Sequence, residues 1–172
     1  MSTPPSASLQ RAAAAVLARD PDRLLALFFL AWRGFAAEPD AILEHEGLGR
    51  VHHRVLYAVV RIPGIKVGEL ATTLGISRQA LHTSLSELVD RKLVKSTVSP
   101  TSRRERQLHV TKRGATLEDR ASGVQRKKLA KIFAASGRSA TAGWVAVMQS
   151  LAASVMSGSP GLLAQIVATE RP

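Results

Sequence analysis

Cysteine is absent from the 172 residues of this chain, and aromatic residues make up only 4% of it. The lack of cysteine excludes disulfide bridges, thiolate zinc sites, cysteine nucleophiles and thiol-based redox sensing. Long hydrophobic runs are missing too. The strongest, residues 24–32, is far shorter than the roughly 20 residues that span a bilayer, and the alanine-rich stretch 12–18 is too short for a secretory signal. We therefore expect a cytoplasmic protein with no membrane partner.

Catalytic motifs are equally absent from the sequence. It has no G-x-S-x-G elbow, no glycine-rich phosphate loop and no spaced pair of carboxylates in an apolar stretch. His45 and Glu46 resemble the start of a zinc-protease motif, but Gly49 stands where the second histidine would be. His52 and His53 follow closely, yet adjacent side chains point about 100° apart on a helix, which disfavours a shared metal. We expect no enzyme, no cofactor and no metal site.

Positive charge is what the chain has in excess. Lysine and arginine number 24 against 13 aspartate and glutamate, a net charge of +11. Residues 50–131 carry 18 of the basic and 6 of the acidic residues, a net of +12, so the excess belongs to the middle of the chain. Such a segment suits a polyanion, either nucleic acid or an anionic membrane. Residues 120–131 lack the tryptophan and phenylalanine of an interfacial helix, which favours nucleic acid.

The spacing of apolar residues predicts a mainly helical chain. A helical pattern begins at Leu9, breaks at Asp20 and resumes from Pro21, with Asp20 as the N-cap. The helix that starts there is apolar on all sides in its first half. Because such a helix is buried on more than one side, we expect a second subunit to cover it. The next helix is predicted over 50–61.

Two short helices joined by a tight turn follow. Apolar residues at helical spacing predict one over 67–74 and one over 78–91, with a break at Gly75 and Ser77 as the N-cap of the second. The period then changes from 3.6 to 2. This change predicts a β-hairpin, whose connecting loop, 99–106, carries three arginines.

Helices also fill the end of the chain. Thr111 is placed to cap a long helix that reaches about residue 135. We expect a linker over 136–142, then an apolar helix over 144–156. A further helical turn or two is predicted within 162–168.

A helix pair with a tight turn and a basic hairpin together predict a winged helix-turn-helix that binds double-stranded DNA. A helix about 10–12 Å wide fits the major groove, which is about 12 Å wide. We assign the outward face of the second helix to that groove, and the arginines of the wing to the minor groove. The major-groove residues are Ser77, Arg78, Gln79, His82, Thr83 and Ser86, and the wing residues are Arg103, Arg104 and Arg106.

Contacts with base edges would distinguish a sequence-specific regulator from an architectural DNA-binding protein. Gln79 suits adenine, and Arg78 suits guanine or a phosphate, as in a sequence-specific regulator. A sequence-indifferent architectural protein remains the alternative, because it would share the same charge and fold.

These residues resemble a known family. Residues 67–81 (VGELATTLGISRQAL) and 88–94 (LVDRKLV) look like the winged-helix core of MarR-type transcription regulators. Residues 99–104 (SPTSRR), leading into 108–114 (LHVTKRG), are similar to that family's wing and the start of its next helix. The resemblance implies a homodimeric repressor. It implies a pseudo-palindromic operator, which the protein releases when a small aromatic or anionic effector binds.

One departure from the family concerns the wing. The family usually has an aspartate two residues before the groove-inserted arginine, which matches Arg104 here, whereas this chain has Ser102. A hydroxyl can hold the turn but cannot form an ion pair with the arginine.

The fold class we expect is mainly α, a winged helix-turn-helix with a two-stranded β wing and with dimerisation helices at both ends. We divide the chain into an N-terminal dimerisation region, 1–49, a DNA-binding domain, 50–114, and a long linking helix with a C-terminal dimerisation helix, 115–172. An effector pocket is predicted between the dimerisation and DNA-binding parts. Its candidate residues are Trp32, His52, His53 and Tyr57.

Overall fold

The computed structural model describes Ala15 and residues 19–100 and 102–156. The chain forms two compact units, Met1–Ala37 and Glu38–Pro172. The helical segments predicted from Leu9 and within 162–168 lie outside the described residues. None of the described helices contains a stretch that is both long and apolar enough to cross a membrane.

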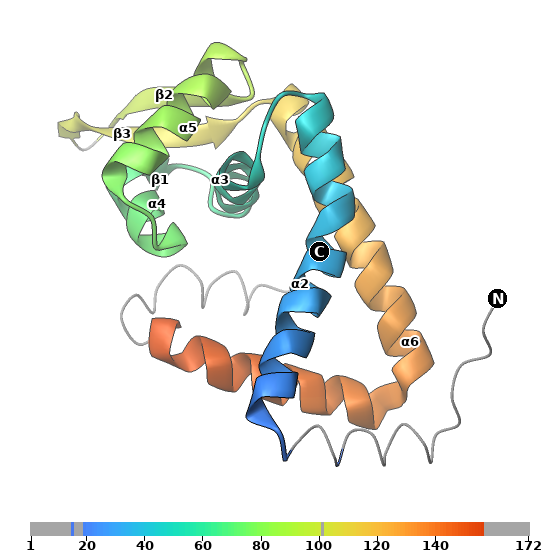
Figure 1. Ribbon diagram of the computed structural model, residues 1–172. Helices are drawn as coiled ribbons and strands as arrows, with labels where there is room; N and C mark the ends of the chain where they lie inside the picture. Colours follow the sequence, from blue (N-terminus) through green and yellow to red (C-terminus); the bar gives the residue numbers. More distant parts are fainter. Residues whose placement is uncertain (1–14, 16–18, 101, 157–172) are drawn as a thin grey trace. The chain divides into compact units, whose positions relative to one another are not determined.

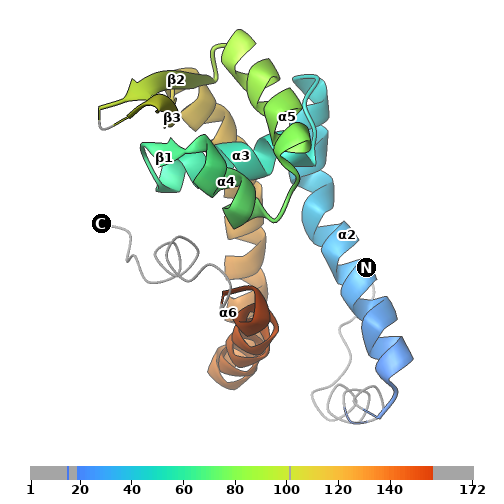
Figure 2. The same ribbon diagram turned by 90° about the vertical axis from the view of Figure 1, so that its left-hand side faces the viewer.

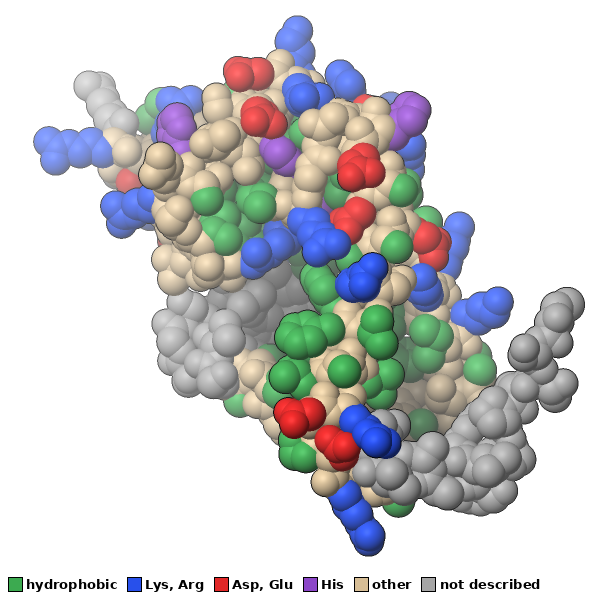
Figure 3. Space-filling view, viewed as in Figure 1, with side chains coloured by type: hydrophobic (Ala, Val, Ile, Leu, Met, Phe, Trp, Pro, Cys, Tyr) green, Lys and Arg blue, Asp and Glu red, His purple; other side chains and the backbone are tan. Residues whose placement is uncertain are grey.

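Helix α2 (Pro21–His45) begins in the first unit, where the sequence predicts its start. The Arg23 N–H donates a hydrogen bond to Asp20 Oδ1 (3.2 Å), so Asp20 is the N-cap and Pro21 the first helical residue. Large apolar side chains in this part of the helix are exposed, and Figure 3 shows them gathered on its surface. They are Leu24, Leu25, Leu27, Phe28, Phe29, Leu30 and Trp32.

The second unit contains the predicted helix-turn-helix. Helices α3 (Arg50–Arg61), α4 (Val67–Leu74) and α5 (Arg78–Asp90) cluster around a small sheet in both ribbon views (Figures 1 and 2). Gly75 ends α4 in the left-handed conformation (φ 60°), which costs glycine no steric penalty. The Ser77 hydroxyl then caps α5 by accepting the Ala80 N–H (3.1 Å). The tight turn therefore forms where the sequence predicts it.

The sheet has three strands rather than the predicted two. Strands β1 (Ile65–Lys66), β2 (Val94–Ser99) and β3 (Ser102–Val110) are antiparallel in the order β1-β3-β2. Pairs such as Ile65 with Leu108 and Ser96 with Leu108 make β3 the central strand. Sequence periodicity missed β1 because two residues are too few to show an alternation.

The wing loop is also shorter than predicted. Ser99 pairs with Ser102, so the loop predicted over 99–106 is wrong and its three arginines lie on β3. The reason is that the end of the hairpin projects beyond the helices (Figures 1 and 2). A ribbon with no core on either side has no apolar alternation for the sequence to reveal.

Helix α6 (Lys112–Met156) replaces the predicted helix, linker and helix. Thr111 caps it as expected, because its hydroxyl accepts the Gly114 N–H (3.1 Å). The linker predicted over 136–142 is wrong: the helix is interrupted only at Gly137, with φ 81° and ψ 169°. Only glycine adopts that conformation readily, so the single residue Gly137 makes the bend. The polar, glycine-containing composition of 136–142 instead suggests a linker of seven residues.

An apolar core fills the second unit between the end of α2, the helices α3, α4 and α5, the sheet and the start of α6. Its fully buried side chains include Leu56, Leu70, Leu81, Leu88 and Leu108. The leucines of α5 point inward, so the opposite face of that helix is left for solvent.

Candidate nucleic-acid interface

The outward face of α5 is the first part of the interface. All six residues that the sequence assigns to the major groove are exposed, and they lie at the N-cap and along one side of the helix. Besides Ser77, whose hydroxyl caps the helix, two of them make local side-chain contacts. Thr83 Oγ donates to the Gln79 carbonyl (3.3 Å), and Ser86 Oγ lies 3.5 Å from Asp90 Oδ2. Arg78, Gln79 and His82 are the long side chains of this face.

Charge along α5 changes from positive at its N-terminal end to negative near its C-terminal end, and the positive end suits DNA binding. Its first turn contains no acidic residue, and its two acids, Glu87 and Asp90, lie near the C-terminal end. The positive end of a helix dipole and the Arg78 guanidinium thus coincide at the N-terminal end. This positive end attracts the phosphate backbone of DNA, and no acidic side chain in the first turn repels it.

The wing forms the second part, and its arginines are not equivalent. Arg104 is exposed on β3, and Arg103 precedes it on the same strand. Arg106 instead bonds across the hairpin: Nε donates to Ser96 Oγ and an Nη to the Ser96 carbonyl, both at 2.7 Å. Arg106 therefore braces the wing, and Arg104 is the better placed of the two to reach DNA.

Two ion pairs near the surface raise the pKa of a basic residue. Lys66 Nζ lies 2.9 Å from Glu105 Oε2 of the wing, and this hydrogen bond raises the pKa of Lys66. At the start of α3, Arg50 pairs with Asp40 (2.7 Å), and this hydrogen bond raises the pKa of Arg50. Both pairs are at the surface, where such contacts contribute little to stability.

His52, a predicted effector residue, lies between α3 and α5. Its Nδ1 accepts the Gly49 N–H (3.0 Å), which caps α3 and leaves the ring hydrogen on Nε2. Nε2 is 2.9 Å from Glu87 Oε2, a close contact whose direction falls short of a hydrogen bond. Both ring nitrogens therefore face groups of the protein itself.

His53, one residue on, faces α6 and belongs to a hydrogen-bonded chain. Arg61 donates to Glu118 Oε1 (2.8 Å), and Ser122 Oγ donates to the same oxygen (2.5 Å). His53 Nε2 lies 3.0 Å from Ser122 Oγ. Because the serine hydrogen points to Glu118, His53 Nε2 must carry the hydrogen of that contact. Burial lowers the pKa of His53 and outweighs the opposing effect of Glu118, which favours the neutral ring.

Glu118, the acid in this hydrogen-bonded network, was not predicted from the sequence. Glu118 and Ser122 are both buried, at positions of α6 that also include Gly114, Leu117 and Ala121. This is the i, i+3, i+4, i+7 spacing of an inward face, so polar residues on an apolar stripe were the available signal. The pair of Arg61 and Glu118 joins α3 to α6 through a salt bridge that is almost wholly buried.

The three predicted effector residues of the second unit, His52, His53 and Tyr57, contact different groups. Tyr57 is exposed beside Arg61, whose guanidinium carbon lies 3.4 Å from the ring centroid. Trp32 belongs to the other unit, where its ring is 6.3 Å from that of Phe35. His52 and His53 point to different helices. Among the residues that the structure describes, no group of three His, Cys, Asp or Glu side chains is placed to hold a metal.

A winged helix-turn-helix whose second helix, α5, exposes Arg78, Gln79 and His82 and has no acidic residue in its first turn defines a class: the chain is a DNA-binding protein of the helix-turn-helix type. The model of the MarR family matches residues 46–105, and the chain belongs to that family. It is similar to the HTH-type transcriptional regulator PetP of Rhodobacter capsulatus. The two are 41% identical over 123 residues, which cover 72% of this chain and 74% of the relative.

Solved structures share the fold. Streptococcus pneumoniae FabT in complex with DNA is similar with a TM-score of 0.73 and 15% identity, over 80% of this chain and 99% of that one. The PcaV transcriptional regulator of Streptomyces coelicolor, in complex with its natural ligand, gives a TM-score of 0.56 and 21% identity, over 79% and 94% of the two chains. As a member of the MarR family, the chain is a DNA-binding transcriptional regulator.

Proposed function

We propose that this MarR-family regulator is a cytoplasmic, homodimeric repressor of a pseudo-palindromic operator. In each subunit, α5 enters the major groove with Arg78, Gln79 and His82, and the wing places Arg104 along the minor groove. A small aromatic or anionic effector releases the DNA. The observation that carries the proposal is the exposed face of α5, which offers hydrogen-bonding and basic side chains and no carboxylate in its first turn.

Relatives support the two halves of this proposal. FabT is described in complex with DNA, and PcaV in complex with its natural ligand, on the fold that this chain shares. A two-fold dimer of such domains requires inverted half-sites about one helical turn apart, or roughly 34–36 Å.

The apolar surface of α2 supports dimerisation. Leu25, Phe29 and Leu30 are each more than half exposed in the single chain, and Figure 3 shows apolar side chains gathered on α2. Apolar side chains are also exposed on α6 beyond Gly137, among them Val147 and Leu151. Exposed apolar patches of this kind mark interaction surfaces, and two-fold self-association is the commonest way to bury them.

A charge placed on this surface tests the dimer. We expect Phe28→Asp to raise the dimer dissociation constant by about 30-fold or more, because a buried aromatic anchor is typically worth 2 kcal/mol or more at an interface. Sedimentation equilibrium measures the constant. Ala41→Asp is the matched control, since it adds the same charge at an exposed position of α2 outside the apolar stretch. Equal behaviour of the two variants would contradict a dimer built on this surface.

Selection from a randomised duplex library tests the proposal as a whole. The purified protein is mixed with the library at about 150 mM salt, and the retained duplexes are sequenced. An enriched inverted repeat is the expected result, with a preference of about 10³-fold or more over bulk DNA. Uniform retention despite tight binding would overturn the operator proposal and favour the architectural alternative.

Two substitutions separate base reading from phosphate binding. We expect Gln79→Ala to cost about 1–3 kcal/mol on the operator and to relax the preference at particular base pairs. Arg104→Ala is expected to weaken binding to every sequence and to lower the salt slope by about one. Fluorescence anisotropy across a salt series measures both, with Arg138→Ala as a control that removes a charge elsewhere. Equal losses of Gln79→Ala on operator and random DNA would remove Gln79 from the base-reading set.

A further inference from the structure

The turn between α2 and α3, residues 46–49, contacts two side chains from the C-terminal end of α5. They are Glu87, in the last turn of the helix, and Arg91, which directly follows it. Because the two residues lie four positions apart, their side chains leave the same side of the helix. Neither is among the residues assigned to the major groove, yet each reaches a different helix end at this turn.

Arg91 binds the C-terminal end of α2. That end closes as a Schellman motif, in which the Leu48 N–H donates to the Leu43 carbonyl (2.8 Å). The Arg91 guanidinium donates to the carbonyls of Glu46 (2.7 Å) and Gly47 (3.3 Å). A cation at the C-terminal end of a helix is favoured by the helix dipole, so these hydrogen bonds are charge-assisted.

Gly47 leaves room for the guanidinium. Its φ is 65°, a left-handed conformation that favours glycine. A Cβ atom at this position would lie 3.4 and 3.5 Å from the two terminal nitrogens of Arg91. The guanidinium therefore packs directly against the turn as well as bonding to its carbonyls.

Glu87 reaches the N-terminal end of α3 through His52. The His52 Nδ1 accepts the Gly49 N–H (3.0 Å), and its Nε2 lies 2.9 Å from Glu87 Oε2. The imidazole is largely buried, with 13% of its side chain exposed. An anion near the start of a helix is favoured by the dipole of that helix. The end of α5 thus presents a cation to the end of α2 and an anion to the start of α3, each with the favourable sign.

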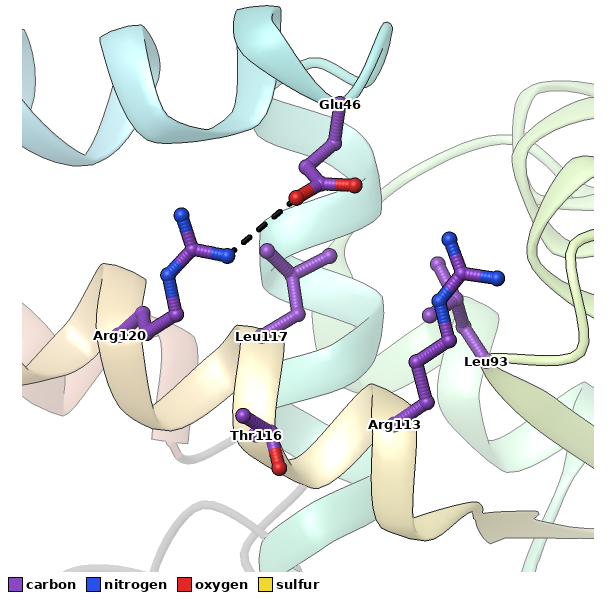
Figure 4. A pocket seen from close by; sticks show the side chains of 6 residues that line it. All are labelled: Glu46, Leu93, Arg113, Thr116, Leu117 and Arg120. Carbon is purple, nitrogen blue, oxygen red and sulfur yellow. Dashed lines mark hydrogen bonds and ion pairs between the residues drawn. The ribbon is translucent and has the colours of Figure 1, made fainter.

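The same turn is attached to α6. Figure 4 shows the Glu46 side chain extending toward Arg120, whose Nη1 lies 3.3 Å from Glu46 Oε1. Glu46 therefore contacts α6 with its side chain and Arg91 with its carbonyl. Any change in the direction of α5 has to break contacts at the ends of α2 and α3, in a turn that α6 also holds.

We propose that Glu87 and Arg91 are positioning residues for DNA binding. They do not touch DNA, but they fix the C-terminal end of α5, so that Arg78 and Gln79 at its other end enter the groove in one pose. The inference rests on the proposed role of α5 in the major groove. Hydrogen bonds to base edges require a fixed geometry, whereas phosphate binding tolerates several poses. Loosening α5 should therefore reduce sequence preference more than binding itself.

Glu87→Ala tests the proposal by the sign of its effect. By charge alone, removing an acid from a DNA-binding helix should tighten binding to every duplex. We expect instead about a fivefold loss on the duplex enriched from the library, without a loss on random DNA, because fewer molecules hold the competent pose. Asp90→Ala is the matched control, since it removes the other, exposed acid of α5. It should keep or raise the affinity for the enriched duplex. Tighter binding of that duplex by Glu87→Ala would overturn the role of Glu87.

Arg91→Ala is expected to lower the affinity for the enriched duplex about tenfold, the value of a lost charge-assisted hydrogen bond. The salt slope should not change, because no phosphate contact is lost. Arg91→Lys should lose most of this affinity too, since lysine lacks the planar pair of donors. Lys92→Ala removes the same charge from the next, exposed residue and should lose far less. A slope lowered by about one, or equal losses for Arg91→Ala and Lys92→Ala, would assign Arg91 to a DNA phosphate and overturn its positioning role.

Fluorescence anisotropy on the enriched duplex and on random DNA measures all these variants. The ratio of the two affinities separates pose from stability, because a smaller folded fraction lowers both equally. An unchanged ratio in Glu87→Ala and Arg91→Ala would overturn the proposal and leave the proposed function intact. If no duplex is enriched at all, the proposed function fails and the positioning role fails with it.

Hydrogen exchange in the free protein tests the contacts without DNA. We expect Arg91→Ala to speed the exchange of the amides of 46–49 and of the last turn of α5 by about tenfold relative to Lys92→Ala. Unchanged exchange would show that Arg91 does not hold this turn, and it would overturn the proposal whatever the result on DNA.

Discussion

Replacing Glu118 by alanine is expected to lower the free energy of unfolding by about 3–5 kcal/mol. The carboxylate is only 3% exposed and accepts hydrogen bonds from both Arg61 and Ser122. Its removal leaves the Arg61 guanidinium, itself largely buried, without its counterion. The cost arises from that uncompensated charge more than from the lost bonds.

Urea denaturation followed by circular dichroism measures the change. Asp119→Ala is the matched control, because Asp119 is the next residue of α6 and carries an ion pair at the surface, with its side chain 76% exposed. We expect it to cost less than about 1 kcal/mol. Converting both Arg61 and Glu118 to leucine should cost less than Glu118→Ala alone, since no buried charge remains. Similar losses for Glu118→Ala and Asp119→Ala would show that the buried pair is not the source of stability.

Gly114→Ala is expected to destabilise the protein by about 3 kcal/mol or more, beyond the usual cost of overpacking. A Cβ atom at this position would overlap the Leu93 carbonyl oxygen and lie 2.9 Å from its carbon and 3.0 Å from Val110 Cγ2. Two of these three atoms belong to the backbone and cannot rotate away. The Leu93 carbonyl is also fixed by Thr111, so relief would require moving α6 away from the end of α5.

Gly123→Ala provides the comparison within the same helix. The nearest atom to a Cβ there is Arg126 Nη2 at 3.6 Å, the end of a flexible side chain. Alanine should therefore stabilise α6 by about 0.5–1 kcal/mol at this position. Thermal unfolding of both variants gives the two signs. Gly114→Ala with parental stability would mean that α6 packs less closely on Leu93 than the structure has it.

The helices of the DNA-binding part were predictable because each has a local signal. Ser77 and Thr111 cap helices at the positions that the sequence indicates, and the apolar spacing of α3, α4 and α5 gives their bounds to within a residue. The strands were harder. The end of the hairpin has no core to impose an alternation, and β1 is two residues long. The sequence predicts a linker around Gly137 instead of a kink, because a polar helical segment with a one-residue bend and a polar linker have similar composition.

The site was predictable where it depends on one helix and unpredictable where it depends on contacts between elements. The exposed face of α5 follows from periodicity alone, and every residue assigned to it is exposed. The partners of His52 and His53 lie 35 and 69 residues away in sequence, on α5 and α6. No local pattern specifies such pairs, and the pocket lined by Glu46, Leu93 and Arg120 (Figure 4) likewise combines three segments that meet only in the folded chain.

The central position of β3 has a mechanical consequence. Because β3 is hydrogen-bonded to β2 on one side and to β1 on the other, tilting the hairpin pulls on the segment that leads directly into α4. The wing is thus tied to the helix-turn-helix through β1. In the proposed dimer, a bound effector would change the distance between the two DNA-binding domains. A shift of a few ångströms against the duplex repeat of about 34 Å would put both domains out of register together.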